Sequence, residues 1–351
     1  MDAVANKENL HNDVYGESFA LYDKKTMEEF IAPFETRFEK NNLNPKTLFS
    51  GKRCLDAGCG NGRGSLFMAR HGAAHIDSVD VSKMNIESTE KNAKIFGFEK
   101  KIKGHESTLE KIPFDDETFD FVFCNGVIMH THNPDACLEE LARVLKVGGK
   151  AWIYVYGAGG VYWYCVYKFR DVLKNRSEKD CMDALAFLQT PTSFLAEYMD
   201  DWKVPYLRTY TNADFSTKLK SLGFENPTPL PFGTDYDTSH RINMFPQDAA
   251  FLGEGDLRYL LTKKENKKSD CPTKIAQPSK YEYPTIFKDA IDKKLDAILP
   301  KLNNNLLITL LTFASLQRNL RDKILSSRTA FNLEVFLSHF DKVLNHLNAA
   351  R

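Results

Sequence analysis

The sequence predicts an α/β protein built on a doubly wound parallel sheet. Between Arg53 and Tyr156, short apolar runs typical of buried strands alternate with segments of helical periodicity, the pattern of a parallel sheet with helices on both faces. The first apolar run leads into a turn with glycines at alternate positions, Gly58, Gly60 and Gly62. Glycine tolerates the positive φ values of a tight strand-to-helix turn and leaves room for a ligand, so this turn is the predicted ligand site.

The residues around the glycine turn favour a ligand with a cationic end. Dinucleotide-binding folds use G-x-G-x-x-G and place a pyrophosphate at the helix N-terminus. Here the spacing is G-x-G-x-G, and Asp56 stands two residues before the first glycine. A carboxylate at that place would repel a pyrophosphate but would attract an amino group or a sulfonium.

The second predicted strand begins at His75 and ends in an acid, Asp80, about twenty residues beyond the turn. In a βαβ unit of this kind the end of the second strand lies beside a ribose. A carboxylate at that place can accept hydrogen bonds from the ribose hydroxyls. Asp80 is therefore the predicted ribose ligand, whereas Asp77 lies inside the strand. Ser82 is the expected N-cap of a helix over residues 83–96.

Four segments resemble motifs of the class I S-adenosyl-L-methionine (SAM) dependent methyltransferases, of the methyltransferase type 11-like kind. Residues 53–63, RCLDAGCGNGR, resemble motif I, a hydrophobic strand followed by D/E-x-G-x-G-x-G. Residues 79–82, 119–130 and 144–149 resemble the family's V-D-x-S, F-D-x-V-x-x-x-x-V-x-x-H and R-V-L-K-P-G-G patterns. The resemblance covers about residues 48–263.

This resemblance implies a Rossmann-like fold with seven strands, the sixth at about residues 225–229 and the last, antiparallel, at 256–263. It also implies SAM as cofactor. The residues that would bind it are Asp56, Ala57, Gly58, Cys59, Gly60, Asn61, Gly62, Asp80, Val81, Ser107, Thr108, Leu109 and Asn125.

Two parts of this implied site rest on particular positions. The family commonly uses an aspartate to accept from the adenine amino group, and no aspartate stands at that place in this sequence. The contact is therefore left to the hydroxyls of Ser107 or Thr108, to Glu106 or to the backbone. Asn125, at the end of the fourth predicted strand, is expected beside the methionyl part of SAM.

The candidate catalytic residues are His130 and Tyr156. An imidazole accepts a proton near neutral pH, so His130 is a candidate general base for an attacking hydroxyl or amine. The alternative is a loop histidine that orients the strand end by hydrogen bonding. Tyr156 belongs to an aromatic cluster over residues 154–167, which would either enclose a cationic group, the SAM sulfonium or an amine of the acceptor, or form a packed core. No metal ligands are predicted.

The flanking segments divide the chain further. Residues 1–46 are expected to form an N-terminal helical cap, which either packs on the main domain or covers the site with Tyr15 or Phe19 near the methyl donor. The SAM-binding methyltransferase domain is expected over 47–263, with a helical lid insertion at 158–208. A linker at 264–280 precedes a helical C-terminal extension, 281–351, whose apolar stripe must pack on the main domain, on another subunit or on a partner.

The composition narrows the functional classes. The 47 basic and 47 acidic residues cancel, so nucleic acid is an improbable partner. Seven cysteines without C-x-x-C pairs fit reduced thiols and a cytoplasmic location, and the polar N-terminus does not resemble a signal peptide. The longest apolar run, residues 306–316, is too short to span a membrane.

The expected function is methyl transfer from SAM to a small-molecule metabolite, with an oxygen, nitrogen or sulfur acceptor held under the aromatic lid. The reaction would be a direct in-line displacement, so the protein mainly aligns the reacting groups and excludes water. The alternatives are methylation of tRNA or protein, or an inactive SAM-binding assembly subunit. The helical tail could also join copies of the chain into a homo-oligomer.

Overall fold

The computed structural model describes residues 23–267, 285–302, 305–326, 329 and 332–349. Their contacts divide the chain into two compact units. The first unit falls within Met1–Gly157, Val204–Thr234 and Asp256–Gln277, and the second within Ala158–Lys203, Asp235–Gly255 and Pro278–Arg351. Each unit is therefore assembled from segments that are separate in the sequence.

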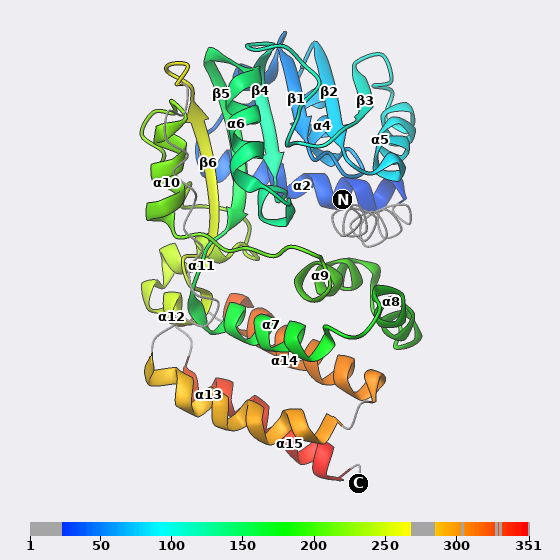
Figure 1. Cartoon of the computed structure of the whole chain (residues 1–351), viewed down its shortest axis with the longest axis vertical. Helices are drawn as coiled ribbons and strands as arrows, with labels where there is room; N and C mark the ends of the chain where they lie inside the picture. The colour runs from blue at the N-terminus through cyan, green and yellow to red at the C-terminus, as the bar shows by residue number, and fades with distance from the viewer. Residues whose placement is uncertain (1–22, 268–284, 303–304, 327–328, 330–331, 350–351) are drawn as a thin grey trace. The chain divides into compact units, whose positions relative to one another are not determined.

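The first unit contains a six-stranded sheet in the order β3-β2-β1-β4-β5-β6 (Figure 1). Its strands are β1 (Arg53–Ala57), β2 (His75–Asp80), β3 (Ile102–Glu106), β4 (Phe119–Asn125), β5 (Leu145–Tyr156) and β6 (Asp256–Thr262). The pairs among β1 to β5 are parallel, and β6 runs antiparallel to β5. This confirms the α/β fold with a mostly parallel sheet and an antiparallel last strand.

The sheet has six strands rather than the seven predicted, because residues 225–229 do not form a strand. Pro227 and Pro229 lie in this segment, and a proline has no N–H to donate to a ladder. Instead of a continuous ladder, isolated backbone hydrogen bonds join this part of the chain to β6, from Glu225 N to Thr262 O (3.0 Å) and from Leu230 N to Arg258 O (2.7 Å). As a result β6 is the edge strand of the sheet.

One face of the sheet is covered by α2 (Lys24–Lys40), α3 (Pro45–Phe49), α4 (Arg63–Arg70) and α5 (Lys83–Ile95). Aromatic rings fill the space between these helices and the strands. Phe38 stacks on Trp152 with ring centroids 5.1 Å apart, and Phe34 meets Phe123 edge to face at 5.2 Å. The predicted N-terminal helix therefore packs on the sheet through α2, while Tyr15 and Phe19 lie outside the described residues.

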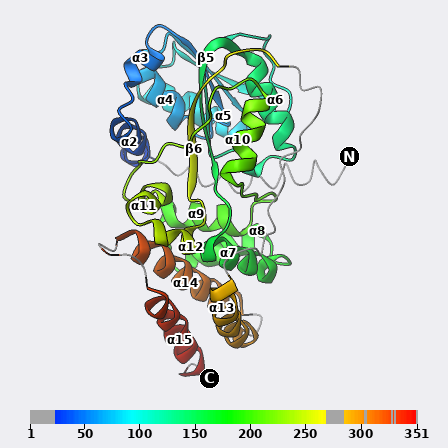
Figure 2. The same ribbon diagram turned by 90° about the vertical axis from the view of Figure 1, so that its left-hand side faces the viewer.

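The other face is covered by α6 (Pro134–Val144) and α10 (Asn212–Ser221). Figure 2 shows these two helices on the side of the sheet opposite to α2, α3 and α4. Alternate residues of the central strands, such as Leu55 and Val122, point into this second core. Both sheet faces are thus buried, as expected of a parallel sheet with near-continuous apolar strands.

The second unit is helical. Its helices are α7 (Gly160–Leu173), α8 (Glu178–Phe187), α9 (Thr192–Trp202), α11 (Thr238–Met244), α12 (Ala249–Leu252), α13 (Thr285–Ile298), α14 (Leu306–Ser326) and α15 (Leu333–Ala349). Phe169 of α7 stacks on Phe313 of α14 at 4.1 Å, so the inserted helices and the C-terminal helices share one core. Among the described residues, no helix combines the length and the apolar composition that a membrane span requires.

The predicted aromatic cluster is divided between the two units. Tyr154 and Tyr156 end β5, whereas the rings of Trp163, Tyr164 and Tyr167 are buried on α7. The Arg258 guanidinium lies 4.1 Å from the Tyr154 ring centroid, and Lys168 Nζ lies 5.2 Å from that of Tyr164. One face of each of these two rings therefore already holds a cation of the protein itself.

Candidate cofactor and active site

The predicted site residues gather at one edge of the sheet. Because β1 to β5 are parallel, their last residues lie along the same edge. The strand order reverses direction between β1 and β4, and a crevice at such a switch point is the usual ligand site of an open α/β sheet. The glycine turn follows β1, and the loop with His130 follows β4.

The glycine turn is tightly packed, and this packing requires glycine. Gly58 has φ +75°, and a Cβ on it would lie 2.5 Å from both methyl groups of Val127, which follows β4. Gly62 has φ +84° and forms the N-cap of α4 in the left-handed conformation. The turn after β1 therefore contacts the loop after β4 directly, across the switch point.

Two residues of α5 hold the turn in place. Thr89 Oγ1 donates to Gly60 O at 2.9 Å, and Asn92 Nδ2 donates to Asn61 O at 2.9 Å. Sequence reasoning missed both. The signal was available, because Asn85, Thr89 and Asn92 recur at helical intervals and are polar residues on a face that is buried.

Three residues of the predicted set are buried within this turn. Ala57 and Cys59 are buried, and Asn61 is 1 % exposed. Among the described residues, Asn61 Nδ2 is a buried donor without a partner. An amide donor of this kind inside a turn is the kind of group that a polar ligand satisfies.

Asp80 lies against the turn and is only 8 % exposed. Its Oδ2 accepts from Gly60 N at 2.9 Å, and its Oδ1 accepts from Ser82 N at 2.9 Å and from Asn85 Nδ2 at 3.1 Å. These bonds hold the carboxylate at the carboxyl end of β2, which is where the prediction places the ribose. Asp80 thus fixes the turn in addition to its predicted role at the ribose.

Asp56 is buried beneath the first turn of α4. Its Oδ2 accepts from Ser65 Oγ at 2.6 Å, and Ser65 Oγ lies 2.7 Å from Ser78 Oγ. Burial raises the pKa of Asp56 to about 6, and the nearby Asp80 carboxylate acts in the same direction, while Ser65 and Arg63 oppose them. The side chain is enclosed by α4, so the prediction that it faces a cationic ligand remains a prediction.

An apolar surface lies beside Asp80. Val81 is 36 % exposed, and Met84, in the first turn of α5, is 44 % exposed. The main-chain N–H of Ser107 donates to Asp80 O at 2.9 Å, which joins the end of β3 to the end of β2. A flat apolar ring could lie on this surface at little cost, which suits the predicted adenine position.

The loop after β3 uses its hydroxyls locally. Ser107 Oγ donates to Lys111 O at 3.2 Å, and Thr108 Oγ1 accepts from Glu110 N at 3.2 Å. Leu109 is buried in the core beneath β4 and α6. Of the three predicted adenine contacts, only Ser107 is therefore tied to the strand edge by its backbone.

Asn125, the last residue of β4, is held by the aromatic core. Its Oδ1 accepts from Trp152 Nε1 at 3.0 Å. Because the indole N–H can only donate, the amide oxygen must face Trp152, and the NH₂ group is directed elsewhere as a donor. An oriented amide at the end of β4 fits a carboxylate or carbonyl of a ligand.

His130 and Tyr156, the two candidate catalytic residues, are neighbours. Their rings meet edge to face with centroids 5.5 Å apart, and His130 is 3 % exposed. His130 Nδ1 lies 2.9 Å from Tyr206 O. A carbonyl only accepts, so Nδ1 carries the proton, and in the neutral ring Nε2 is the basic nitrogen. His132, by contrast, is exposed and lies 3.5 Å from Glu110.

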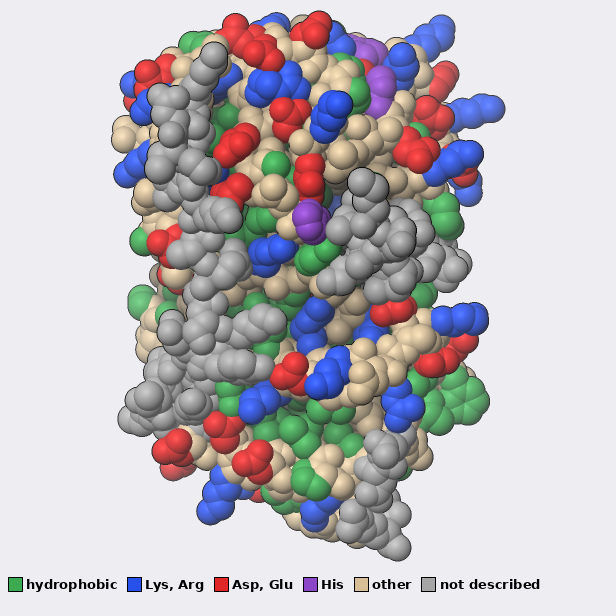
Figure 3. All heavy atoms as spheres, viewed as in Figure 1, with side chains coloured by type: hydrophobic (Ala, Val, Ile, Leu, Met, Phe, Trp, Pro, Cys, Tyr) green, Lys and Arg blue, Asp and Glu red, His purple; other side chains and the backbone are tan. Residues whose placement is uncertain are grey.

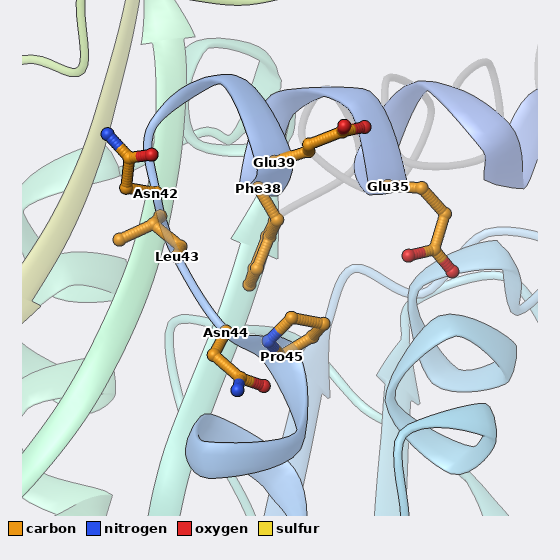
Figure 4. A pocket seen from close by; sticks show the side chains of 7 residues that line it. All are labelled: Glu35, Phe38, Glu39, Asn42, Leu43, Asn44 and Pro45. Atoms are coloured by element: carbon orange, nitrogen blue, oxygen red, sulfur yellow. The ribbon is translucent and has the colours of Figure 1, made fainter.

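A separate surface cavity of about 450 Å³ lies where α2 passes into α3 (Figure 4). Its lining residues are Glu35, Phe38, Glu39, Asn42, Leu43, Asn44 and Pro45. None of the predicted site residues is among them. This cavity is therefore separate from the predicted site residues at the strand edge.

Comparison with known proteins points to the same segment. Residues 55–153 match the family model described as a methyltransferase domain. The chain is 30% identical over 100 residues to a sarcosine/dimethylglycine N-methyltransferase of Aphanothece halophytica, covering 28% of this chain and 36% of that protein. It is 31% identical over 118 residues to a ubiquinone biosynthesis O-methyltransferase of Marinobacter nauticus, covering 32% and 48%.

One solved structure similar to this chain is that of the YcgJ protein of Bacillus subtilis. The two chains are 16% identical with a TM-score of 0.43, and the match covers 65% of this chain and 99% of that chain. The chain spans less than half the length of the two curated relatives named above.

The chain thus carries a methyltransferase domain. The match is consistent with a class I SAM-dependent methyltransferase and supports SAM as the cofactor. The residues present fit that cofactor, because a buried amide donor lies in the turn and a carboxylate lies at the end of β2.

Proposed function

We propose that the protein transfers a methyl group from SAM to a small molecule whose accepting oxygen or nitrogen carries a proton. The observation that carries this proposal is the contact of the glycine turn with the loop after β4, because Val127 touches Gly58 three residues before His130. A methyl donor on the turn and a base on the loop would then act at one point of the strand edge.

Each group has a distinct task in the proposed reaction. The turn, Asp80 and Asn125 would hold the nucleoside and amino-acid ends of SAM, which would supply a methyl group from its sulfonium and be released as the thioether S-adenosylhomocysteine. Nε2 of His130 would accept the proton that the acceptor oxygen or nitrogen loses as its new bond to the methyl carbon forms. The Tyr156 ring, edge to face with His130, limits the positions that the imidazole can take.

The relatives support a small acceptor but not a particular one. Their names include an N-methyltransferase of sarcosine and dimethylglycine, an O-methyltransferase of ubiquinone biosynthesis and a sterol 24-C-methyltransferase of Gibberella zeae. On the face drawn in Figure 3, basic and acidic side chains of the described residues are interspersed. A mixed surface of this kind suits a small acceptor better than a polyanion.

Labelled methyl transfer tests the proposal. The full chain is incubated with methyl-labelled SAM and with sarcosine, dimethylglycine, catechols, sterols, total RNA or unfolded protein. We expect label in a small molecule, and a loss of about 10²- to 10⁴-fold in His130→Gln. His132→Gln, on the same loop, is the matched control and should stay within a few fold. Label only in RNA or protein, or SAM binding without transfer to any acceptor, would support the alternatives instead.

Three further predictions belong to this proposal. The inserted helices at 158–208 are expected to govern the choice of acceptor, as a lid would. Residues 204–208 of that segment fall in the first unit, so an exchange of residues 158–203 alone should change acceptor preference while SAM affinity stays within a few fold. A cytoplasmic location and a homo-oligomer formed through the C-terminal helices remain predictions.

A further inference from the structure

A short segment that follows α9 runs along the carboxyl ends of β4 and β5. We refer to residues 204–211 as the crossing segment. Tyr210 N donates to Tyr156 O at 2.9 Å, and Tyr210 forms an isolated parallel bridge with Gly157. The crossing segment is thereby anchored to the end of β5, beside the loop that carries His130.

Arg208 of the crossing segment forms hydrogen bonds to that loop. Its guanidinium donates to Thr131 O at 2.5 Å and to His132 O at 3.1 Å, the carbonyls that follow His130 in the chain. It also lies 5.1 Å from the ring centroid of Tyr206, two residues earlier. A planar guanidinium with several fixed donors suits a task in which two carbonyls and a ring must be held together.

The same segment determines the protonation of His130. Its backbone carbonyl at Tyr206 accepts from Nδ1, which leaves Nε2 as the basic nitrogen. The position of that carbonyl depends on the register between the crossing segment and the loop. Arg208 supplies two of the hydrogen bonds that set this register, and both are charge-assisted and so stronger than neutral ones.

We propose that Arg208 is a positioning residue for His130. Through the Tyr206 carbonyl it keeps Nδ1 protonated and presents Nε2 as the proton acceptor. The catalytic value of this arrangement rests on the proposed function, but the hydrogen-bonding arrangement itself does not. The two can therefore be tested apart.

Nuclear magnetic resonance of the histidine rings gives the direct test. Long-range proton–nitrogen spectra of the full chain with ¹⁵N-labelled histidine distinguish the two neutral tautomers, and His130→Gln assigns the His130 signals. We expect the wild type to show the Nδ1–H tautomer alone. Arg208→Gln should give a mixture of tautomers or the Nε2–H form, because glutamine lacks the second donor pair and the charge.

Two variants make the test selective. Arg208→Lys keeps the charge but has no planar fork, so its spectrum should lie between those of the wild type and Arg208→Gln, and it also serves if Arg208→Gln does not fold. Arg70→Gln removes an arginine that pairs with Glu28 on α2, far along the chain from the loop, and should leave the His130 signals unchanged. A folded Arg208→Gln or Arg208→Lys protein with the wild-type tautomer pattern would overturn the proposal.

Methyl transfer then separates this inference from the proposed function. With an acceptor found as above, Arg208→Gln should lower kcat by about ten- to hundred-fold with little change in KM for SAM, since a misplaced base affects the chemical step. If His130→Gln keeps full activity, the base role fails while the tautomer result stands. If His130→Gln is inactive and Arg208→Gln keeps both activity and tautomer, only the positioning role is wrong.

Discussion

Asp56 holds its proton more tightly in the folded protein than in the unfolded chain. Burial raises its pKa from 3.8 to about 6. Ionising the buried group therefore costs stability, and this cost grows as the pH rises from about 4 to about 6 and is complete above that. At about 1.4 kcal/mol for each pKa unit, the cost at neutral pH is on the order of 3 kcal/mol.

Asp56→Asn should reveal this cost as a pH dependence. The amide keeps an acceptor for Ser65 but cannot ionise, so the difference in unfolding free energy between variant and wild type should move in the variant's favour by about 3 kcal/mol between pH 4 and pH 7. Urea unfolding at several pH values measures it. A difference that stays constant over this range would show that Asp56 is not desolvated as described.

Asp120→Asn is the matched control with the opposite sign. Burial alone would raise the pKa of Asp120, but hydrogen bonds from Lys146 and from the main chain of Arg53 lower it below its ordinary value. Its stabilising contribution is therefore present above the unfolded pKa and is lost on acidification. The Asp120→Asn variant should lose stability relative to the wild type as the pH rises from 3 to 6.

Gly58 and Gly97 separate backbone strain from steric clash. Both have nearly the same positive φ, +75° and +76°, yet a Cβ on Gly97 meets nothing within 4 Å, whereas one on Gly58 meets the Val127 methyls at 2.5 Å. Gly97→Ala should cost only the left-handed penalty, about 1 to 2 kcal/mol. Gly58→Ala should cost more and also weaken SAM binding, and Gly58→Ala with Val127→Ala should recover part of both.

Thermal unfolding and SAM titration of these variants measure the two effects. Equal losses of stability in Gly58→Ala and Gly97→Ala, with SAM binding intact in both, would contradict the close packing of the glycine turn on the loop after β4.

The residues of the turn could be predicted from the sequence because their spacing carries the signal. The residues that hold the turn and His130 in place were not identified from the sequence. Arg208 contacts carbonyls more than seventy residues earlier in the chain, and a bond to a carbonyl leaves no trace in the identity of the partner residue. Thr89 and Asn92 could have been found, since buried polar residues on one helix face indicate a partner.

A buried network of hydrogen bonds links helix α14 to α7 and α9. Asp201 Oδ2 accepts from Tyr162 OH and from Gln317 Nε2, both at 2.5 Å, and Gln317 Oε1 accepts from Trp202 Nε1 at 2.6 Å. Gln317 is therefore bonded to two residues of α9 at once. The network links a C-terminal helix to two helices of the insertion inside the second unit.

Removing the Gln317 amide should destabilise that unit. Gln317→Leu leaves the Trp202 N–H without its acceptor and takes one donor from Asp201, and each such buried group costs about 1 to 3 kcal/mol. We expect a total loss of about 2 to 4 kcal/mol in urea unfolding. Leu311→Gln, 51 % exposed on the same helix, is the control and should change stability by less than about 0.5 kcal/mol. Equal stability of both variants would show that the network contributes nothing.

At the scale of elements, the strand predicted from His75 to Asp80 is β2, and the helix predicted over residues 83–96 is α5. Ser82 does cap α5, with Ser82 Oγ accepting from Asn85 N at 3.4 Å. The exception is the segment at residues 225–229, for which the resemblance to the family implied a strand that the structure does not contain. Its two prolines were visible in the sequence and argued against a ladder.

At the scale of the whole molecule, the division into two units was not predictable. The sequence suggested a lid and a tail as separate additions, yet α7 to α9 and α13 to α15 belong to one unit. Contacts such as that of Phe169 with Phe313 depend on side-chain packing between distant segments, which periodicity within one helix does not specify.

Calorimetric titration of the full chain with SAM tests the central claim most directly, with Asp80→Asn as the variant and Asp115→Asn, at an exposed position, as the control. We expect the wild type and the control to bind one SAM with equal affinity. Asp80→Asn should bind at least about tenfold more weakly, because it loses a charge-assisted acceptor at the ribose and weakens the bond to Gly60 N. No binding by the wild type, or unchanged affinity in Asp80→Asn, would contradict the claim that the glycine turn and Asp80 form the SAM site.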